Sequence, residues 1–262
     1  MKKYSFNVFA PTLKISANSN IAVSPSKDGL IKVEVDGTDK AIEGITVEQQ
    51  GDTIVIEDRS SGSSAALNPS FLANVFQSFS GNVSNISMVD GVIHIGGGSG
   101  SVYVNGKRIG LDGDRAESKE PYKATLITIY TPIADLDLTI KGLAKFASSQ
   151  SFDHATVDLS GSTQAIFTAN SIDLDLSGTS KVKANIQGGD LTADTSGCST
   201  ASIVGDFKSC KTDSSGTSKI NTSGTCHGDY KANASGCSGI RHKGAIQGRS
   251  REKVSGVANI NI

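Results

Sequence analysis

The pair Ser-Gly recurs in register through the second half of the chain. One series stands at 160-161, 177-178, 196-197, 215-216, 235-236 and 255-256, with successive intervals of 17, 19, 19, 20 and 20 residues. A nearly fixed period of this length means that each repeat is one structural rung, which cannot bury its apolar face alone and must stack on its neighbours. The sequence therefore predicts a solenoid.

Within each repeat, apolar residues alternate with polar ones. The positions six, four and two residues before each repeat glycine are predicted to point inward; they are Leu136, Leu138, Ile140; Ala155, Val157, Leu159; Ile172, Leu174, Leu176; Leu191, Ala193, Thr195; Cys210, Thr212, Ser214; Tyr230, Ala232, Ala234; and Ser250, Glu252, Val254. The fourth position after the glycine gives a second inward column, Ala165, Val182, Ala201, Ile220, Ile240 and Ile260. A period of two over short segments indicates half-buried strands. The sequence thus predicts an all-β fold, a parallel β-helix of about seven rungs in which glycine occupies a tight corner.

The chain divides into three parts by composition. Residues 1–58 form a β-rich N-terminal segment, with a hairpin turn at Gln50-Gly51-Asp52, and are either a sandwich-like start or irregular first rungs of the solenoid. Residues 59–118 are predicted to be an insertion, with a short helix after Asn68-Pro69 and a hairpin whose strands, near 93–95 and 102–107, flank a glycine-rich loop. Residues 119–262 hold the β-helix repeats.

Composition limits the partners. With 25 basic and 26 acidic residues the net charge is -1, which argues against nucleic acid as a partner. No stretch of apolar residues is long enough for a membrane-spanning helix, and the first eleven residues do not have the pattern of a signal peptide. We therefore expect either a cytoplasmic protein or the mature form of an exported one.

Four cysteines, Cys198, Cys210, Cys226 and Cys237, lie in the repeats. Cys198 and Cys237 share a column but lie two rungs apart, which is too far for a disulfide. Cys210 and Cys226 fall in different columns of adjacent rungs, so a bridge between them depends on local geometry. We expect free, small core cysteines, with a disulfide or a metal site as the alternatives.

Acidic residues recur three positions before the repeat glycine. Asp158, Asp175, Asp194 and Asp213 are predicted to stack on the outer surface, followed by Asn233 and Lys253, with Lys181 and Lys219 on the flank to offset part of the repulsion. Such a column is either a solvated face or a ladder of carboxylates that binds calcium, the one cofactor that the sequence suggests.

No catalytic arrangement is visible in the sequence. His94, His154, His227 and His242 occupy different registers without a companion nucleophile, so we expect no enzyme. The repeated Ser, Thr, Asn and Lys of the outer faces suit weak multivalent contacts with a glycan or a protein. A polysaccharide-acting enzyme is the weaker alternative, and it would need a groove lined by charged residues from several rungs.

The segments Val157-Asp158-Leu159-Ser160-Gly161-Ser162 and Leu174-Asp175-Leu176-Ser177-Gly178-Thr179 resemble the auto-transporter adhesin head domain family, also called the head GIN domain. The resemblance extends over 13–262, with 59–118 as a departure from the pattern. It implies a right-handed β-helix without catalytic activity, of bacterial origin, exported to the cell envelope and suspected of adhesion. A cytosolic protein-interaction scaffold is the alternative. The ends of the solenoid could also pair with other copies to form a homo-oligomer.

Overall fold

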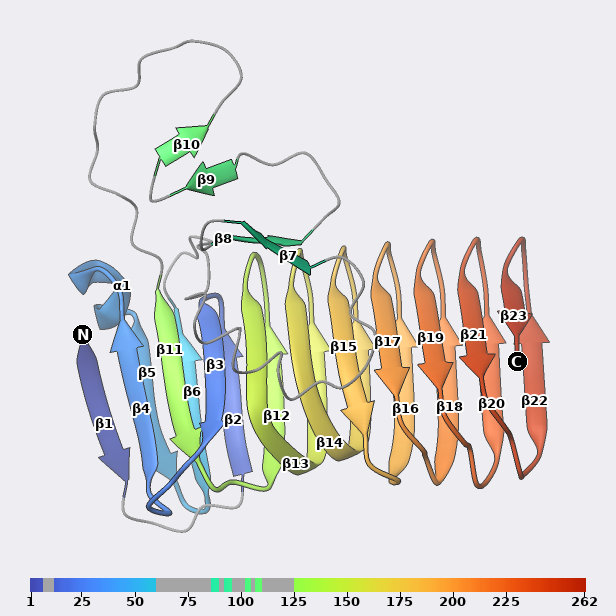
Figure 1. Cartoon of the computed structure of the whole chain (residues 1–262), viewed down its shortest axis with the longest axis horizontal. Coiled ribbons are helices and arrows are strands. Elements are labelled where there is room, and N and C mark those ends of the chain that lie inside the picture. Colours follow the sequence, from blue (N-terminus) through green and yellow to red (C-terminus); the bar gives the residue numbers. More distant parts are fainter. Residues whose placement is uncertain (7–11, 60–85, 90–91, 96–101, 105–106, 110–124) are drawn as a thin grey trace.

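The protein is a two-faced ladder of strands in the computed structural model, which describes residues 1–6, 12–59, 86–89, 92–95, 102–104, 107–109 and 125–262. The fold is all-β, with 65% of the described residues in strands and a solenoid of about seven turns (Figure 1). Each turn contributes one strand to each of two faces, so most strands pair with the equivalent strand one turn away. The β-helix predicted from the repeats is confirmed.

The first face, here called face A, is formed by strands that pair in parallel along the solenoid. In order they are β6 (Thr53–Asp58), β2 (Thr12–Ala17), β12 (Asp135–Ile140), the second halves of β13 (Lys145–Leu159) and β14 (Gln164–Leu176), β16 (Asp190–Thr195), β18 (Ser209–Ser214), β20 (Tyr230–Ala234) and β22 (Ser250–Val254).

The second face, face B, is also parallel over most of its length. It runs from β11 (Leu126–Thr131) and β3 (Asn20–Pro25) through the first halves of β13 and β14 to β15 (Lys181–Ile186), β17 (Thr200–Val204), β19 (Lys219–Ser223), β21 (Gly239–Lys243) and β23 (Asn259–Asn261). β13 and β14 therefore continue around a corner from one face to the other.

The N-terminal strands are the first coils of the same ladder. β2 pairs in parallel with β12, and β3 pairs in parallel with β11, so the chain leaves the solenoid after β6 and returns into it at 125–131. Three strand pairings at this end are antiparallel. β4 (Ile31–Asp36) pairs with both β1 (Lys2–Phe6) and β11, and β5 (Ile45–Gln50) pairs with β6 across the turn expected at Gln50-Gly51-Asp52. A short helix that the sequence analysis did not predict, α1 (Asp39–Glu43), joins β4 to β5, with Thr38 as its N-cap.

The inserted segment contains two hairpins where one was expected. β7 (Ile86–Val89) pairs with β8 (Val92–Ile95), and β9 (Val102–Val104) pairs with β10 (Lys107–Ile109), all antiparallel. The strands near 93–95 and 102–107 are therefore not partners of each other. Two-residue Asp-Gly and Asn-Gly segments, 90–91 and 105–106 in the sequence, stand between the paired strands, and these are strong hairpin signals. The helix predicted after Asn68-Pro69 lies outside the described residues.

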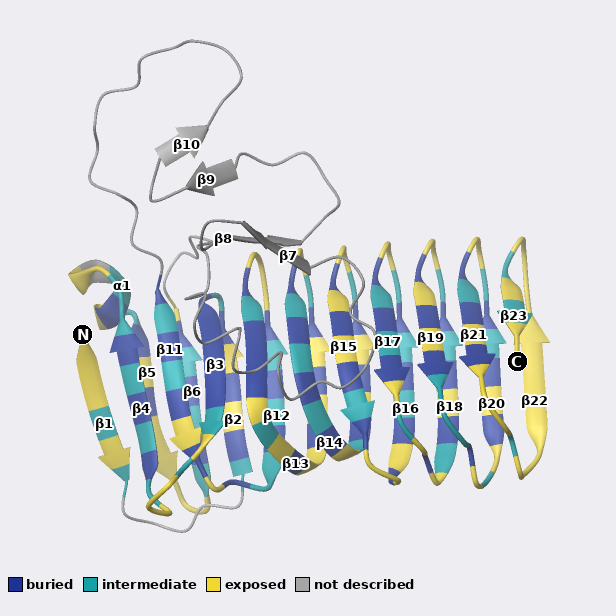
Figure 2. Cartoon of the chain, viewed as in Figure 1, coloured by how far each residue is buried: buried dark blue, intermediate teal, exposed yellow. Residues whose placement is uncertain are grey.

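The interior follows the predicted columns. Every inward position from Leu136 to Ala234 is buried, and so is the second column from Ala165 to Ile240 (Figure 2). The exception is the last strand of face A, where Ser250, Glu252 and Val254 are exposed. The reason is that β22 pairs only with β20, so its inward side chains stack on those of one neighbouring rung instead of two.

The corners combine glycine with a buried hydroxyl. Gly178 has φ +68°, and a Cβ there would lie 2.6 Å from the carbonyl oxygen of Gly161 in the previous rung. Two residues later, the buried Ser180 donates to the carbonyl oxygen of Ser177 at 2.7 Å, and Ser199 does the same to Ser196 at 2.6 Å. Ser180 thus gives the carbonyl oxygen of Ser177 a partner within the turn, and Ser199 adds a second, shorter hydrogen bond to the carbonyl oxygen of Ser196, which also accepts from the Ser199 N–H at 3.4 Å.

The four cysteines are free thiols, as expected, but only two belong to the core. Cys210 and Cys226 are buried, whereas Cys198 and Cys237 are exposed at the corner after the repeat glycine. Burial raises the pKa of the Cys210 thiol to about 12. A thiol in this state is a packing residue rather than a nucleophile.

Candidate functional site

The predicted acid column exists on the outer surface of face A. Asp158 stands opposite Asp175, Asp175 opposite Asp194, and Asp194 opposite Asp213 in the strand register. Parallel pairing in perfect register aligns these positions because the spacing from strand to corner is the same in each rung. The carboxylates are therefore neighbours at the distance of adjacent strands, ~4.8 Å.

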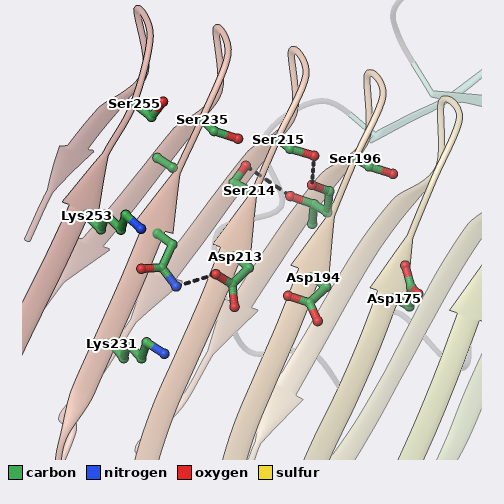
Figure 3. A pocket seen from close by; sticks show the side chains of 13 residues that line it. Asp175, Asp194, Ser196, Asp213, Ser214, Ser215, Lys231, Ser235, Lys253 and Ser255 are labelled. Carbon is green, nitrogen blue, oxygen red and sulfur yellow. Dashed lines mark hydrogen bonds between the residues drawn. The ribbon is translucent and has the colours of Figure 1, made fainter.

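An open groove of about 650 Å³ runs along this column across five rungs (Figure 3). Asp175, Asp194 and Asp213 line one part of it, and Lys231 and Lys253 line the part nearer the C-terminus. The serines that precede the repeat glycines form its other side: Ser196, Ser215, Ser235 and Ser255. The groove thus offers carboxylates, ammonium groups and hydroxyls on a backbone that the ladder holds in place.

The acidic part of the groove is under electrostatic strain. Burial, with the nearby charges of Asp158 and Asp173, raises the pKa of Asp175. Burial and the charge of Asp213 raise the pKa of Asp194, which the cation of Lys211 only partly offsets. The predicted compensation by Lys181 and Lys219 is wrong, because both residues are on the strands of face B.

The charge of the outward side chains changes from negative to positive after Asp213. The amide Nδ2 of Asn233 donates to the carboxylate of Asp213, and Lys211 Nζ lies 3.5 Å from the same carboxylate. Beyond this point, Lys231 stands opposite Arg251 and Asn233 opposite Lys253. One end of the groove is therefore anionic and the other cationic.

The calcium ladder predicted from Asp158, Asp175, Asp194 and Asp213 stays a prediction. Two carboxylates on adjacent strands are close enough to share a hard cation, and calcium takes oxygen ligands of this kind. Within the described ranges, however, no three His, Cys, Asp or Glu side chains converge on one point. The aspartates form a row, so each bound cation would draw its remaining ligands from water or from a bound molecule.

Three histidines can be placed, and they do not meet. His154 and His227 are exposed and contact Thr156 and Gln247, whereas His242 is buried between Phe207 and Tyr230. His94 belongs to β8, which forms a two-stranded sheet with β7. None of the three described imidazoles lines the groove.

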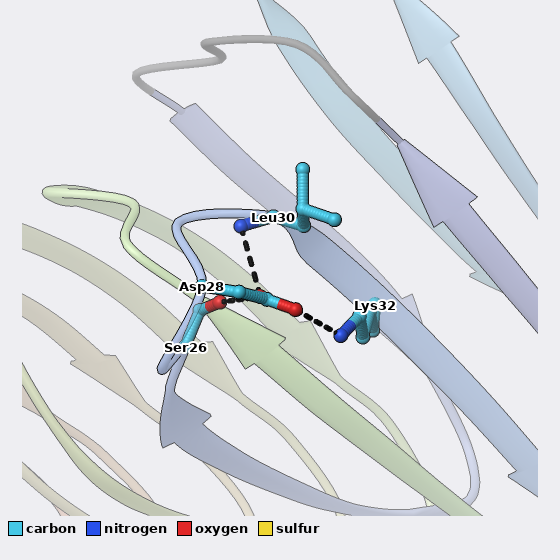
Figure 4. Close-up of polar contacts among 4 residues, drawn as sticks. All are labelled: Ser26, Asp28, Leu30 and Lys32. Atoms are coloured by element: carbon cyan, nitrogen blue, oxygen red, sulfur yellow. Dashed lines mark hydrogen bonds and ion pairs between the residues drawn. The ribbon is translucent and has the colours of Figure 1, made fainter.

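Among the described residues, the carboxyl group with the most strongly lowered pKa belongs to a turn, outside the groove. Asp28 accepts hydrogen bonds from Lys32, from Ser26 Oγ at 2.9 Å and from the backbone N–H of Leu30 at 3.2 Å (Figure 4). These donors lower the pKa of Asp28 to about 2. The cluster closes the connection between β3 and the antiparallel β4, which is a structural role.

The fold has known counterparts. A putative adhesin from Bacteroides fragilis shares 14% sequence identity with the chain, with a TM-score of 0.52 over 100% of this chain and 96% of that one. A putative adhesin from Parabacteroides distasonis gives 13% identity and a TM-score of 0.51, with the same shares of each chain covered. The protein has an adhesin-like fold.

No family model matches the chain, and no curated protein matches it either. At these identities, the two crystal structures establish the architecture and leave the ligand open. The resemblance to the head GIN domain family accordingly remains a prediction. Among the described residues, no helix has the length and apolar character needed to span a membrane.

The sequence analysis found the acid column but missed the groove and its cationic end. Lys231 was not singled out, although Lys211, Lys231 and Arg251 occupy one position, five residues before the repeat glycine. Following the outward positions to the last repeat would have revealed that their charge changes from negative to positive. The hollow shape itself depends on side-chain packing and has no sequence signal.

Proposed function

We propose that the protein is a non-catalytic binding module of a bacterial cell envelope, adhesin-like in action, and that the groove on face A is its binding surface. The observation that carries the proposal is the groove itself, in which residues of β14, β16, β18, β20 and β22 present polar and charged groups side by side. A rigid ladder fixes these groups before a ligand arrives, which lowers the entropic cost of binding. The adhesin-like fold is consistent with this use.

Repetition suits the groove to a linear ligand. Ser196, Ser215 and Ser235 occupy the same place in consecutive rungs, so a polymer that follows the solenoid axis meets the same group again and again. Individually weak contacts then add up along the chain. A glycan or an extended protein segment meets this requirement.

Blocking the groove tests the proposal. Ser235 lines the groove, and its hydroxyl makes no hydrogen bond within the described part of the chain, so Ser235→Trp fills the groove without removing a contact. Ser202→Trp, at an outward position of β17 on face B, is the matched control. Both variants and the parent protein are applied to arrays of glycans and of envelope or extracellular proteins.

We expect a ligand whose capture is lost in Ser235→Trp and kept in Ser202→Trp. Repeating the assay with calcium and with a chelator tests the calcium ladder at the same time, since a requirement for calcium should disappear when Asp175 and Asp194 are replaced by Asn. A ligand that both tryptophan variants bind equally well would contradict the groove as the binding surface.

A second candidate function is the cleavage of a polysaccharide. One observation favours it: a groove lined by charged residues from several rungs contains Asp175 and Asp194, whose pKa values are raised, as a general acid requires. Incubation with a panel of polysaccharides, followed by measurement of new reducing ends, tests it. Release that Asp194→Asn abolishes would establish an enzyme and overturn the non-catalytic proposal.

A further inference from the structure

The cationic end of the groove is not neutralised by the protein. In the described ranges no carboxylate forms an ion pair with Lys231, Arg251 or Lys253, whereas Lys211 is paired with Asp213. Lys231 and Arg251 are register partners on β20 and β22, and Lys253 follows two residues after Arg251 on the same face of the strand. Three exposed positive charges therefore gather on two adjacent strands.

These charges continue into a region of opposite sign. Asp194 and Asp175 line the same groove three and four rungs before Lys253 in the column, and burial together with the neighbouring negative charges raises their pKa values. An anionic group of a ligand is attracted near Lys253 and would be repelled near Asp175. At about 5 Å, a pair of like charges costs roughly 1 kcal/mol even in water.

The groove also lacks the features that nucleic acids and peptides require for binding. Its lining contains no aromatic side chain, and Ala234 is the one lining residue whose side chain has no polar group. Bases of single-stranded nucleic acid stack on aromatic residues, and peptides bind through buried aromatic or aliphatic anchors. Hydroxyl groups of a sugar need neither, since Ser215, Ser235 and the free carboxylates of Asp175 and Asp194 are hydrogen-bond partners for them.

We propose that the groove binds a glycan chain that ends in an acidic sugar, with the terminal carboxylate on Lys231 and Lys253 and the neutral sugars along the serines and aspartates toward Asp175. This inference rests on the proposed function of the groove and names the class of ligand. The lysines attract the acidic tip, and the aspartates accept hydrogen bonds from neutral hydroxyls while they repel further anionic groups. The acid column thus selects against polymers that are charged along their whole length.

The test compares three soluble probes: sialyllactose, which has an acidic sugar at its end, lactose, which lacks it, and a heparin oligosaccharide, which is anionic throughout. Binding is measured by NMR titration of the protein at fixed ionic strength, because long-range attraction is screened by salt. We expect sialyllactose to bind most tightly of the three.

Two pairs of substitutions locate the binding. Lys231→Gln with Lys253→Gln should weaken sialyllactose binding by roughly tenfold for each lysine, the loss expected for a charge-assisted hydrogen bond. Arg241→Gln with Lys243→Gln removes the same charge from two exposed outward positions of β21 on face B and should leave binding unchanged. Asp175→Asn with Asp194→Asn should increase the affinity for heparin, because the repulsion is gone.

The outcomes separate this inference from the proposed function. Equal binding of lactose and sialyllactose, tighter binding of heparin to the parent protein, or equal losses in the two pairs of lysine and arginine variants would each overturn the acidic-tip ligand. If Ser235→Trp still abolishes capture of some neutral glycan or protein on the arrays, the groove remains a binding surface. If no ligand responds to Ser235→Trp, both proposals fail.

Discussion

A single glycine column sets how closely successive rungs can approach. Gly178 needs a positive φ, and its α-carbon lies against the backbone of Gly161, so two separate requirements exclude a side chain there. A serine or an alanine at this position would be strained by the positive φ, and its Cβ would collide with the carbonyl oxygen of Gly161, which the paired strands hold in place. Glycine therefore recurs at this position because the backbones of successive rungs are in contact there.

Gly178→Ala should lower the free energy of unfolding by about 3 kcal/mol or more, since the strain of the left-handed conformation adds to the clash. Gly29→Ala is the matched control: its φ is +74°, but nothing lies within 4 Å of the added Cβ, so we expect a loss of about 1 kcal/mol. Urea denaturation followed by circular dichroism measures both. Equal losses in the two variants would mean that the contact between rungs is unimportant.

His242 is a buried titratable residue in the solenoid interior. It is 5% exposed, its Nδ1 lies 3.0 Å from Thr222 Oγ1, and its Nε2 has no hydrogen-bond partner among the residues that the structure describes. The centroid of its ring is 5.0 Å from that of Tyr230 and 5.7 Å from that of Phe207. Burial lowers the pKa of His242 from its ordinary value of 6.5, because a charged imidazole in this place would lose its hydration.

This shift makes stability depend on pH. As the pH falls below about 6.5, the unfolded chain binds a proton before the folded protein does, so the free energy of unfolding decreases through this range. His242→Phe should remove that part of the decrease. Urea denaturation of both proteins at pH 7.5 and 5.5 tests the prediction, and an unchanged slope in the variant would assign the pH dependence to other groups.

At the scale of elements, parallel pairing in register turns a position in the repeat into a column on a face. The alignment of Asp175, Asp194 and Asp213 across β14, β16 and β18 is a consequence of strand register, since a slip of one residue would turn every carboxylate inward. The cost is repulsion between like charges. In the proposed function, the groove that the column lines gives these charges a role.

Asp194→Asn should therefore stabilise the protein at neutral pH. The folded protein has a raised pKa at Asp194, so the penalty from its ionised form is present above that pKa and disappears as the pH falls toward the unfolded value of 3.8. Because the carboxylate is partly exposed, the gain should not exceed about 1 kcal/mol. Thermal unfolding at pH 7 and pH 3.5 measures it, and a gain that persists at pH 3.5 would point to a cause other than charge.

The whole molecule is a one-dimensional stack, so each rung is stabilised mainly by the rungs beside it. The interior is mostly aliphatic and aromatic through β13 and β14 but includes Thr195, Thr212, Ser214 and Thr222 farther along, and β22 is exposed at every residue. Stability should consequently decrease along the solenoid toward its C-terminal rungs.

Hydrogen exchange measured by mass spectrometry tests this gradient. We expect the amides of β13 and β14 to be the slowest to exchange, those of β18 and β20 to be intermediate, and those of β22 to be the fastest, because local opening of a terminal rung breaks only one interface. Uniform protection along the 262-residue chain would instead indicate a single cooperative unit.

The sequence by itself determined the β-helix, its period, its inward columns and the acid column, because all of these depend on spacing within one repeat, and stacking merely copies that spacing from rung to rung. It did not determine how 1–58 joins the ladder, since the pairing of β2 and β3 with β12 and β11 brings together segments more than 100 residues apart. Nor did it reveal the groove or the unpaired charges of Lys231 and Lys253. Those depend on which side chains lie side by side on neighbouring rungs and on the space left between them, and only the tertiary structure decides that.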